Sequence, residues 1–152
     1  MKILDVLSRE AAIADLKSVD KKGVLEELAQ PLARISGVDQ NELVRILLER
    51  ERLGSTGIGG GIGIPHGKMK GLTNLILGFG LSKKGVNFES IDGRPAHIFF
   101  LLITPENSTG LHLKLLARIS RMLKNDRFRQ KLMKSADPDD ILTIIREEDD
   151  DF

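Results

Sequence analysis

The sequence predicts one α/β domain in which helices cover both faces of a β-sheet. A chain of 152 residues with 41% apolar and 30% charged residues has the size and composition of a single globular domain with its own core. Residues 96–103 read Ala-His-Ile-Phe-Phe-Leu-Leu-Ile, a run apolar on both alternating faces, as expected for a central strand with helices on either side. Segments with helical periodicity precede and follow that strand.

The first elements are a short strand and a helix. Residues 11–16 predict an edge strand, and Asp20 is typical of the residue that caps a helix. We expect Pro31 to kink this helix near Gln30 and Gly37 to end it. Apolar residues recur between these limits at helical spacing: Val24, Leu25, Leu28, Leu32 and Ile35.

A second helix is predicted over residues 40–53, after a capping box formed by Asp39 and Glu42. Its apolar stripe consists of Leu43, Ile46, Leu47 and Leu53. Arg50 falls in the middle of this stripe. Because an unpaired buried charge is costly, Arg50 either binds an anion or extends its guanidinium to water at the helix end.

The next stretch holds six glycines between positions 54 and 63, more than a turn requires. It ends in Ile62-Gly63-Ile64, which predicts a very short strand, and Pro65 should then present His66 at a defined angle. Gly67 has no side chain to cover the ring, so it is included among the candidate binding residues. The alternative is a flexible loop with an incidental histidine.

Later elements follow the same logic. Residues 75–81 predict a buried strand, and 96–103 the central strand, whose His97 is assigned no chemistry. Thr104-Pro105 should break that strand, and Ser108 is a candidate N-cap.

A helix is predicted over residues 109–124, and His112 lies on its apolar stripe near the N-terminus. A histidine on an apolar helix face is often a packed core residue. The N–H groups of a helix N-terminus attract anions, however, so a role in anion binding stays open.

Two short helices should complete the domain, which we place at residues 1–147. One carries Phe128, Leu132 and Met133, and the other starts at Asp137-Pro138. Residues 148–152 form an acidic tail that we expect to be disordered. The net charge is +1, although residues 147–151 carry five negative charges, so the rest of the chain is moderately basic and suits an anionic partner.

Composition also excludes several classes of function. There is no cysteine, and three histidines leave little material for a metal site, so no metal or other cofactor is expected. No apolar run is long enough to span a membrane and no secretory pattern opens the chain, so we expect a cytoplasmic protein. Nucleic-acid binding is not expected, since Trp, Tyr and dense basic blocks are absent. The glycines match neither a Walker A nor a dinucleotide-binding pattern.

Residues 50–68, Arg-Glu-Arg-Leu-Gly-Ser-Thr-Gly-Ile-Gly-Gly-Gly-Ile-Gly-Ile-Pro-His-Gly-Lys, together with His112, resemble the enzyme IIA domains of the fructose/mannitol class in the bacterial phosphotransferase system. The resemblance covers nearly the whole chain and is closest to the nitrogen-regulatory branch. It implies a single domain with a mixed sheet sandwiched between helices, a three-layer α/β/α fold. It also implies a phosphohistidine at His66 with Arg50 and His112 as its companions.

The resemblance implies a mechanism as well. A small carrier protein phosphorylated on histidine, similar to HPr or NPr, would dock over His66, and the neutral imidazole would attack phosphorus in line. Arg50 and His112 would receive the phosphoryl oxygens, helped by N–H groups of the glycine-rich loop and of the 109–124 helix. The step needs no metal.

Two alternatives remain at this stage. The chain could be the enzyme IIA of a sugar-uptake system that passes phosphate to an enzyme IIB; the lack of a fused IIB, carrier or membrane segment favours regulation of target proteins instead. It could also be a non-catalytic module that binds an anion or a protein.

Overall fold

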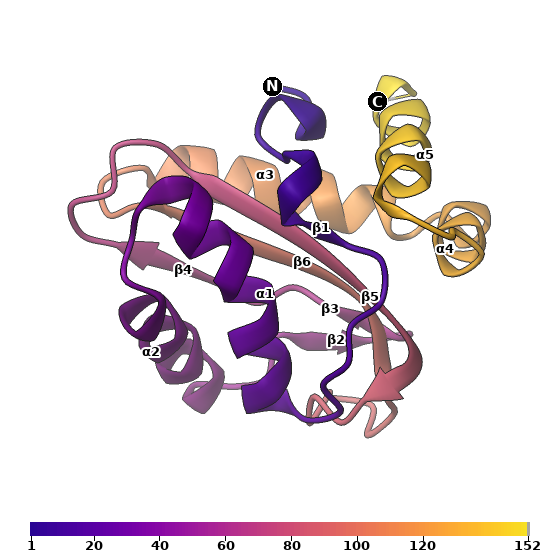
Figure 1. Ribbon diagram of the computed structural model, residues 1–152, viewed down its shortest axis with the longest axis horizontal. Helices are drawn as coiled ribbons and strands as arrows, with labels where there is room; N and C mark the ends of the chain where they lie inside the picture. Colours follow the sequence, from indigo (N-terminus) through magenta and orange to yellow (C-terminus); the bar gives the residue numbers. More distant parts are fainter. Residues whose placement is uncertain (152) are drawn as a thin grey trace.

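A mixed six-stranded sheet lies at the centre of the computed structural model, which describes residues 1–151 (Figure 1). Its strands are β1 (Ala12–Ile13), β2 (Gly57–Gly59), β3 (Ile62–Gly63), β4 (His66–Met69), β5 (Ile76–Val86) and β6 (Ala96–Pro105). The order is β1-β5-β6-β3-β2, and β4 also pairs with β6. The β1–β5, β3–β6 and β4–β6 pairs are parallel, whereas β5–β6 and β2–β3 are antiparallel.

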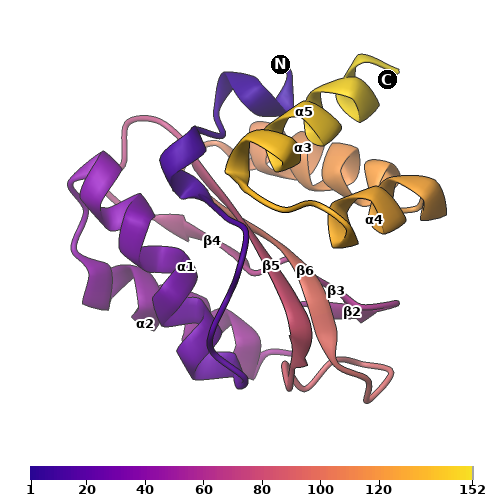
Figure 2. The ribbon, with the colours of Figure 1, turned by 45° about the vertical axis from the view of Figure 1, so that its right-hand side comes forward.

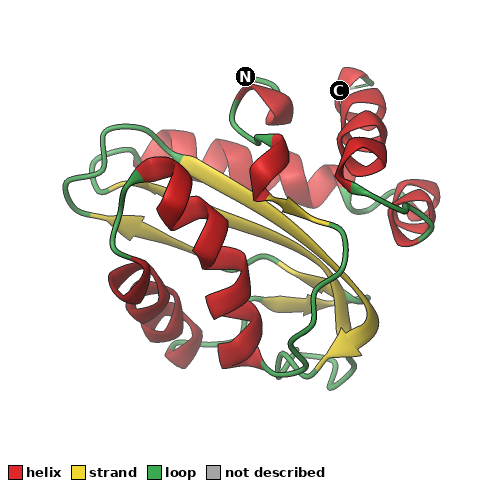
Figure 3. Ribbon diagram, viewed as in Figure 1, coloured by secondary structure: helices red, strands yellow, loops and turns green. Residues whose placement is uncertain are grey.

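Helices cover both faces of this sheet, which confirms the three-layer prediction. On one face lie α1 (Lys21–Ser36) and α2 (Gln40–Arg52); on the other lie α3 (Thr109–Met122), α4 (Asp126–Met133) and α5 (Pro138–Asp150) (Figures 2 and 3). Two 3-10 turns, η1 (Ile3–Asp5) and η2 (Arg9–Ala11), precede β1. Within residues 1–151, no helix has the length and apolarity needed to cross a bilayer.

The core is densest where β5 and β6 pair. All residues of β6 except His97 are buried, and the rings of Phe79 and Phe100 meet edge to face with centroids 5.0 Å apart. Each fully buried side chain of this size contributes about 1.5–3 kcal/mol. A Cβ on Gly80 would lie 2.6 Å from Leu28 Cδ2, so glycine here lets α1 pack directly against β5.

Most helix starts follow the predicted caps. Asp20 accepts a hydrogen bond from Gly23 N at 2.8 Å, and Asp39 accepts one from Glu42 N at 3.0 Å. Gly37 ends α1 in the left-handed conformation with φ 80°, and the helix continues through Pro31 to that point. Ser108 occupies the N-cap position of α3 without a side-chain cap bond.

The predicted disorder of the acidic tail is wrong for residues 148–150, which belong to α5. Asp149 is only 1% exposed, and its carboxylate accepts from Ile3 N at 2.6 Å and from Arg118 Nε at 2.6 Å. The acidic run therefore contains a buried carboxylate that ties the N-terminal turn to α3 and α5. Phe152 lies outside the described residues.

Candidate functional site

An open cleft of ≈570 Å³ lies at the outer edge of β4, where α2 and α3 approach from opposite faces of the sheet. It brings together the three residues singled out from the sequence: His66, His112 and Arg50. The cleft is lined by Ile46, Glu49, Arg50 and Leu53 of α2 and its end, His66, Gly67 and Lys68 of β4, and His112 of α3.

His66 is placed by an interruption in the strand next to β6. β3 and β4 run parallel to β6 in the same register, with Ile62 opposite Ile98 and His66 opposite Leu102. Ile64 and Pro65 separate the two strands, because proline has no N–H for the ladder. The predicted short strand before the histidine is confirmed, and His66 itself begins the next strand.

The imidazole of His66 has one nitrogen engaged and one available. Nδ1 lies 2.7 Å from the carbonyl oxygen of Ile64, and since a carbonyl only accepts, Nδ1 carries the proton. Burial lowers the pKa of His66 below its usual 6.5, and nearby Arg50 lowers it further; the Ile64 carbonyl and Glu51 oppose this shift. At neutral pH the ring is therefore uncharged, with a lone pair on Nε2.

His112 is buried and adjacent to His66. The ring centroids are 5.4 Å apart with an interplanar angle of 61°. Nδ1 of His112 lies 2.7 Å from Thr104 Oγ1. Burial first, then the proximity of His66 and Lys68, lowers the pKa of His112 to about 4, so this ring is also neutral at pH 7.

Arg50 lies half-buried at the end of α2, and its Nη1 donates to Gly54 O at 2.9 Å. Within residues 1–151 it makes no ion pair with a carboxylate, so the rest of its donors can serve an anion in the cleft. Leu53 departs from the predicted stripe: it lies just after the last residue of α2, Arg52, and is 84% exposed.

Gly67 does more than leave the ring uncovered. A Cβ there would lie 2.9 Å from Ile46 Cγ2, so glycine allows α2 to pack closely over β4. Lys68 is a cation of the cleft that sequence reasoning missed; its Nζ donates to Thr109 Oγ1 at 2.8 Å. Its position two residues after His66 in a strand could have indicated a shared face.

Glu51 is a second residue near the cleft that the sequence patterns did not single out. It is buried and accepts from Thr56 N at 3.1 Å and from Thr56 Oγ1, and it forms an ion pair with Lys21 Nζ at 3.1 Å. These contacts tie the end of α2 to α1 and to the start of the glycine-rich stretch. Glu51 lies one turn after Leu47 on the buried side of α2, and that spacing was the available signal.

The glycines between positions 57 and 63 form a β2–β3 hairpin rather than a loop around the cleft. Gly59, Gly60 and Gly61 have φ of 93°, 66° and 81°. A Cβ on Gly57 would lie 2.3 Å from Ser90 Oγ, and one on Gly63 would lie 2.7 Å from Phe99 Cε1. Because none of these glycines lines the cleft, the expected contribution of their N–H groups to anion binding is wrong.

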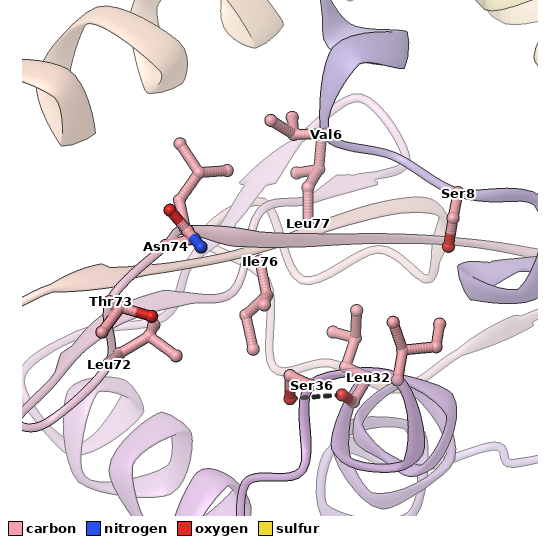
Figure 4. A pocket seen from close by; sticks show the side chains of 11 residues that line it. Val6, Ser8, Leu32, Ser36, Leu72, Thr73, Asn74, Ile76 and Leu77 are labelled. Atoms are coloured by element: carbon pink, nitrogen blue, oxygen red, sulfur yellow. Dashed lines mark hydrogen bonds between the residues drawn. The ribbon is translucent and has the colours of Figure 1, made fainter.

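Two other hollows among residues 1–151 are lined differently: one has no ionisable side chain, and the other combines His97 with Arg129 but holds no second histidine. The hollow between α1 and the start of β5, shown in Figure 4, is lined by apolar and uncharged polar side chains, among them Leu32, Ser36 and Asn74. His97 lies outside the cleft, with Nδ1 2.8 Å from Ser82 O. No cluster of three metal-ligating side chains occurs in the described part of the chain.

Comparison with known proteins gives concordant results. The model of the family described as phosphoenolpyruvate-dependent sugar phosphotransferase system, EIIA 2, matches residues 5–148. A nitrogen regulatory protein of Bradyrhizobium diazoefficiens is 39% identical over 145 residues, which are 95% of this chain and 95% of that protein. The fructose-specific EIIABC component of Bacillus subtilis is 35% identical over 150 residues, which are 98% of this chain but 24% of that longer protein. The crystal structure of the nitrogen regulatory protein IIA-Ntr from Neisseria meningitidis superposes with a TM-score of 0.87 at 31% identity, covering 93% of this chain and 97% of that one.

Proposed function

Because this chain belongs to the EIIA 2 family of the phosphoenolpyruvate-dependent sugar phosphotransferase system, we propose that His66 is the residue on which it carries a phosphoryl group. The chain is a IIA-Ntr-type phosphocarrier domain, and domains of this family transfer phosphoryl groups through a histidine. One observation supports His66: Nε2 is its unbonded nitrogen, in a cleft that also holds Arg50 and His112.

The proposed reaction exchanges one P–N bond for another. The Nε2 lone pair of His66 attacks phosphorus in line, and the bond from phosphorus to the donor histidine breaks, returning its electron pair to the donor ring. The proton on Nδ1 of His66 stays in its hydrogen bond to Ile64 O. No separate base is required, since the lowered pKa of His66 already leaves the ring neutral at pH 7.

Arg50, His112 and Lys68 supply the positive and polar groups that the transferring phosphoryl needs. The transition state spreads negative charge over three oxygens, and donors aligned beforehand stabilise it. Each charge-assisted hydrogen bond contributes about 1.5–3 kcal/mol, or roughly 10- to 150-fold in rate if it forms only in the transition state. Gly67 leaves the entrance to the ring open from β4.

The donor is a histidine-phosphorylated carrier protein similar to HPr or NPr. Direct transfer between two histidines requires the donor surface to cover the rim of the cleft. An exposed leucine lines the cleft: Leu53, which follows α2, is 84% exposed. Its side chain offers an apolar contact to a protein partner that covers the cleft.

The downstream role is regulation related to nitrogen, by analogy with the relatives that this chain matches along nearly their full length. Target proteins would then distinguish the phosphorylated and unphosphorylated surfaces, which differ by nearly two negative charges. The similarity to a fructose-specific component supports a second candidate, transfer to an enzyme IIB in sugar uptake.

Both steps can be tested with purified proteins. Incubation with the phosphorylated carrier should place acid-labile phosphate on the wild-type chain and on His97→Ala, but not on His66→Ala. His97 is the matched control because it lies outside the cleft. Retained labelling of His66→Ala would move the site elsewhere. Loss of the label upon addition of an enzyme IIB domain would favour uptake over regulation.

A further inference from the structure

The hydroxyl of Thr104 is buried and contacts His112, a residue that lines the cleft. Thr104 lies in β6, opposite Lys68 of β4, and is 0% exposed. Its Oγ1 is 2.7 Å from His112 Nδ1. Among residues 1–151 this is the one hydrogen-bond partner of the hydroxyl, so its single proton has one acceptor within reach.

Two arrangements of protons are compatible with that distance. If Nδ1 of His112 carries the ring proton, Nδ1 donates to Oγ1 and the hydroxyl proton of Thr104 is left buried without an acceptor. If Thr104 donates to Nδ1 instead, both groups are satisfied and the ring proton resides on Nε2. Leaving a buried donor unpaired has a desolvation cost, so the second arrangement is favoured.

Nε2 of His112 is the nitrogen that a group in the cleft can reach. It has no hydrogen-bond partner among the described residues. The only buried side-chain nitrogen or oxygen there that lacks a hydrogen bond is Ser90 Oγ, so Nε2 of His112 is not a buried atom. Nε2 is therefore open to solvent, in a residue that lines the cleft.

We propose that Thr104 is a positioning residue that holds His112 in the Nε2–H tautomer, so that His112 presents a hydrogen-bond donor to the phosphoryl group. This role rests on the proposed transfer to His66. In the opposite tautomer, a bare Nε2 lone pair would face the anionic oxygens and repel them. A neutral ring can thus assist the transfer without becoming a cation, because its proton is held on the correct side.

The first test needs neither a variant nor a phosphate donor. Nitrogen-15 NMR of the unphosphorylated protein at pH 7 should show His112 with a protonated Nε2 and an unprotonated Nδ1. A protonated Nδ1 in the wild-type protein would overturn the proposal, whether or not His66 is the phosphorylated residue.

The second test separates the hydroxyl from side-chain volume. Thr104→Val keeps the shape of the side chain but removes the hydroxyl. In this variant His112 should lose its preference for the Nε2–H tautomer. Phosphoryl transfer should slow by about 10-fold or more, the effect of one hydrogen bond to a charged group. Thr104→Ser should restore the tautomer and keep the rate within about 3-fold of wild type. Thr143→Val, an exposed position on α5, is the matched control and should change neither.

The outcomes separate this proposal from the function on which it rests. An unchanged tautomer and rate in Thr104→Val would leave the hydroxyl with a purely structural role and refute the proposal. Should Thr104→Val fail to fold, the wild-type spectrum and Thr104→Ser still decide. If His66 accepts no phosphate, the transfer function fails while the tautomer result stands.

Discussion

Nδ1 of His66 lies 2.7 Å from the carbonyl oxygen of Ile64, two residues earlier in the chain. Pro65 lies between them and interrupts the strand that would otherwise run from β3 into β4. The hydrogen bond therefore forms across a single proline and orients the ring of His66 from its own backbone. This contact determines which nitrogen is available for chemistry.

We predict that phosphate is attached to Nε2 of His66 and not to Nδ1. Nδ1 already donates a hydrogen bond to Ile64 O. Breaking that bond would leave the carbonyl without a partner in a half-buried site. Nitrogen-15 and phosphorus-31 NMR of the phosphorylated protein distinguish the two isomers. Phosphate on Nδ1 would contradict the orientation described here.

Arg50→Lys should slow phosphoryl transfer by about 10-fold, because lysine keeps the charge but loses the planar set of donors. Arg52→Lys is the matched control: it lies two residues further along α2 and is exposed outside the cleft. Transfer rates measured with the phosphorylated carrier, along with unfolding curves for both variants, provide the comparison. Equal rates for the two variants would assign Arg50 only its bond to Gly54 O.

The stability of the fold should depend on His112 between pH 4 and pH 6.5. The pKa of His112 is lowered to about 4 in the folded chain, so between these values the unfolded state binds more protons. The stabilising contribution is full above pH 6.5 and is lost as pH falls towards 4, by roughly 3 kcal/mol at most.

Urea unfolding of wild type and His112→Asn across this range measures the effect. The difference in free energy of unfolding, wild type minus variant, should increase with pH up to about 6.5 and then level off. A difference independent of pH would mean that His112 titrates alike in both states.

Glu51→Gln should reduce the free energy of unfolding by about 2–4 kcal/mol, because it leaves Lys21 beside a neutral partner in a mostly buried position. Glu49→Gln, two residues earlier and exposed, should change it by less than about 0.5 kcal/mol. Chemical denaturation measures both. We also expect slower transfer in Glu51→Gln, since Glu51 anchors the end of α2 that carries Arg50; similar stability for the two variants would argue against this anchor.

Much of the fold could be read from local patterns. Asp20, Asp39 and Asp137 cap helices where their positions indicated, and the apolar run of β6 is the buried centre of the sheet. These features depend on neighbours within a few residues, so a single sequence contains the information. The acidic tail misled the prediction, because the charge of Asp149 is neutralised by Arg118, 31 residues away.

The candidate site also has features that the sequence indicated and features that only the packing of the chain determined. From sequence alone came the prediction that His66, Arg50 and His112 form a site, through residue type, helical phase and a distinctive run of glycine, proline and histidine. Tertiary structure alone decided that β4 brings these three residues to one cleft with Lys68, that the glycines form a hairpin elsewhere, and that Glu51 and Thr104 contact Thr56 and His112. The physical reason is that a hydrogen bond such as Thr104 to His112 depends on how a strand and a helix pack, and no spacing along the chain specifies that distance.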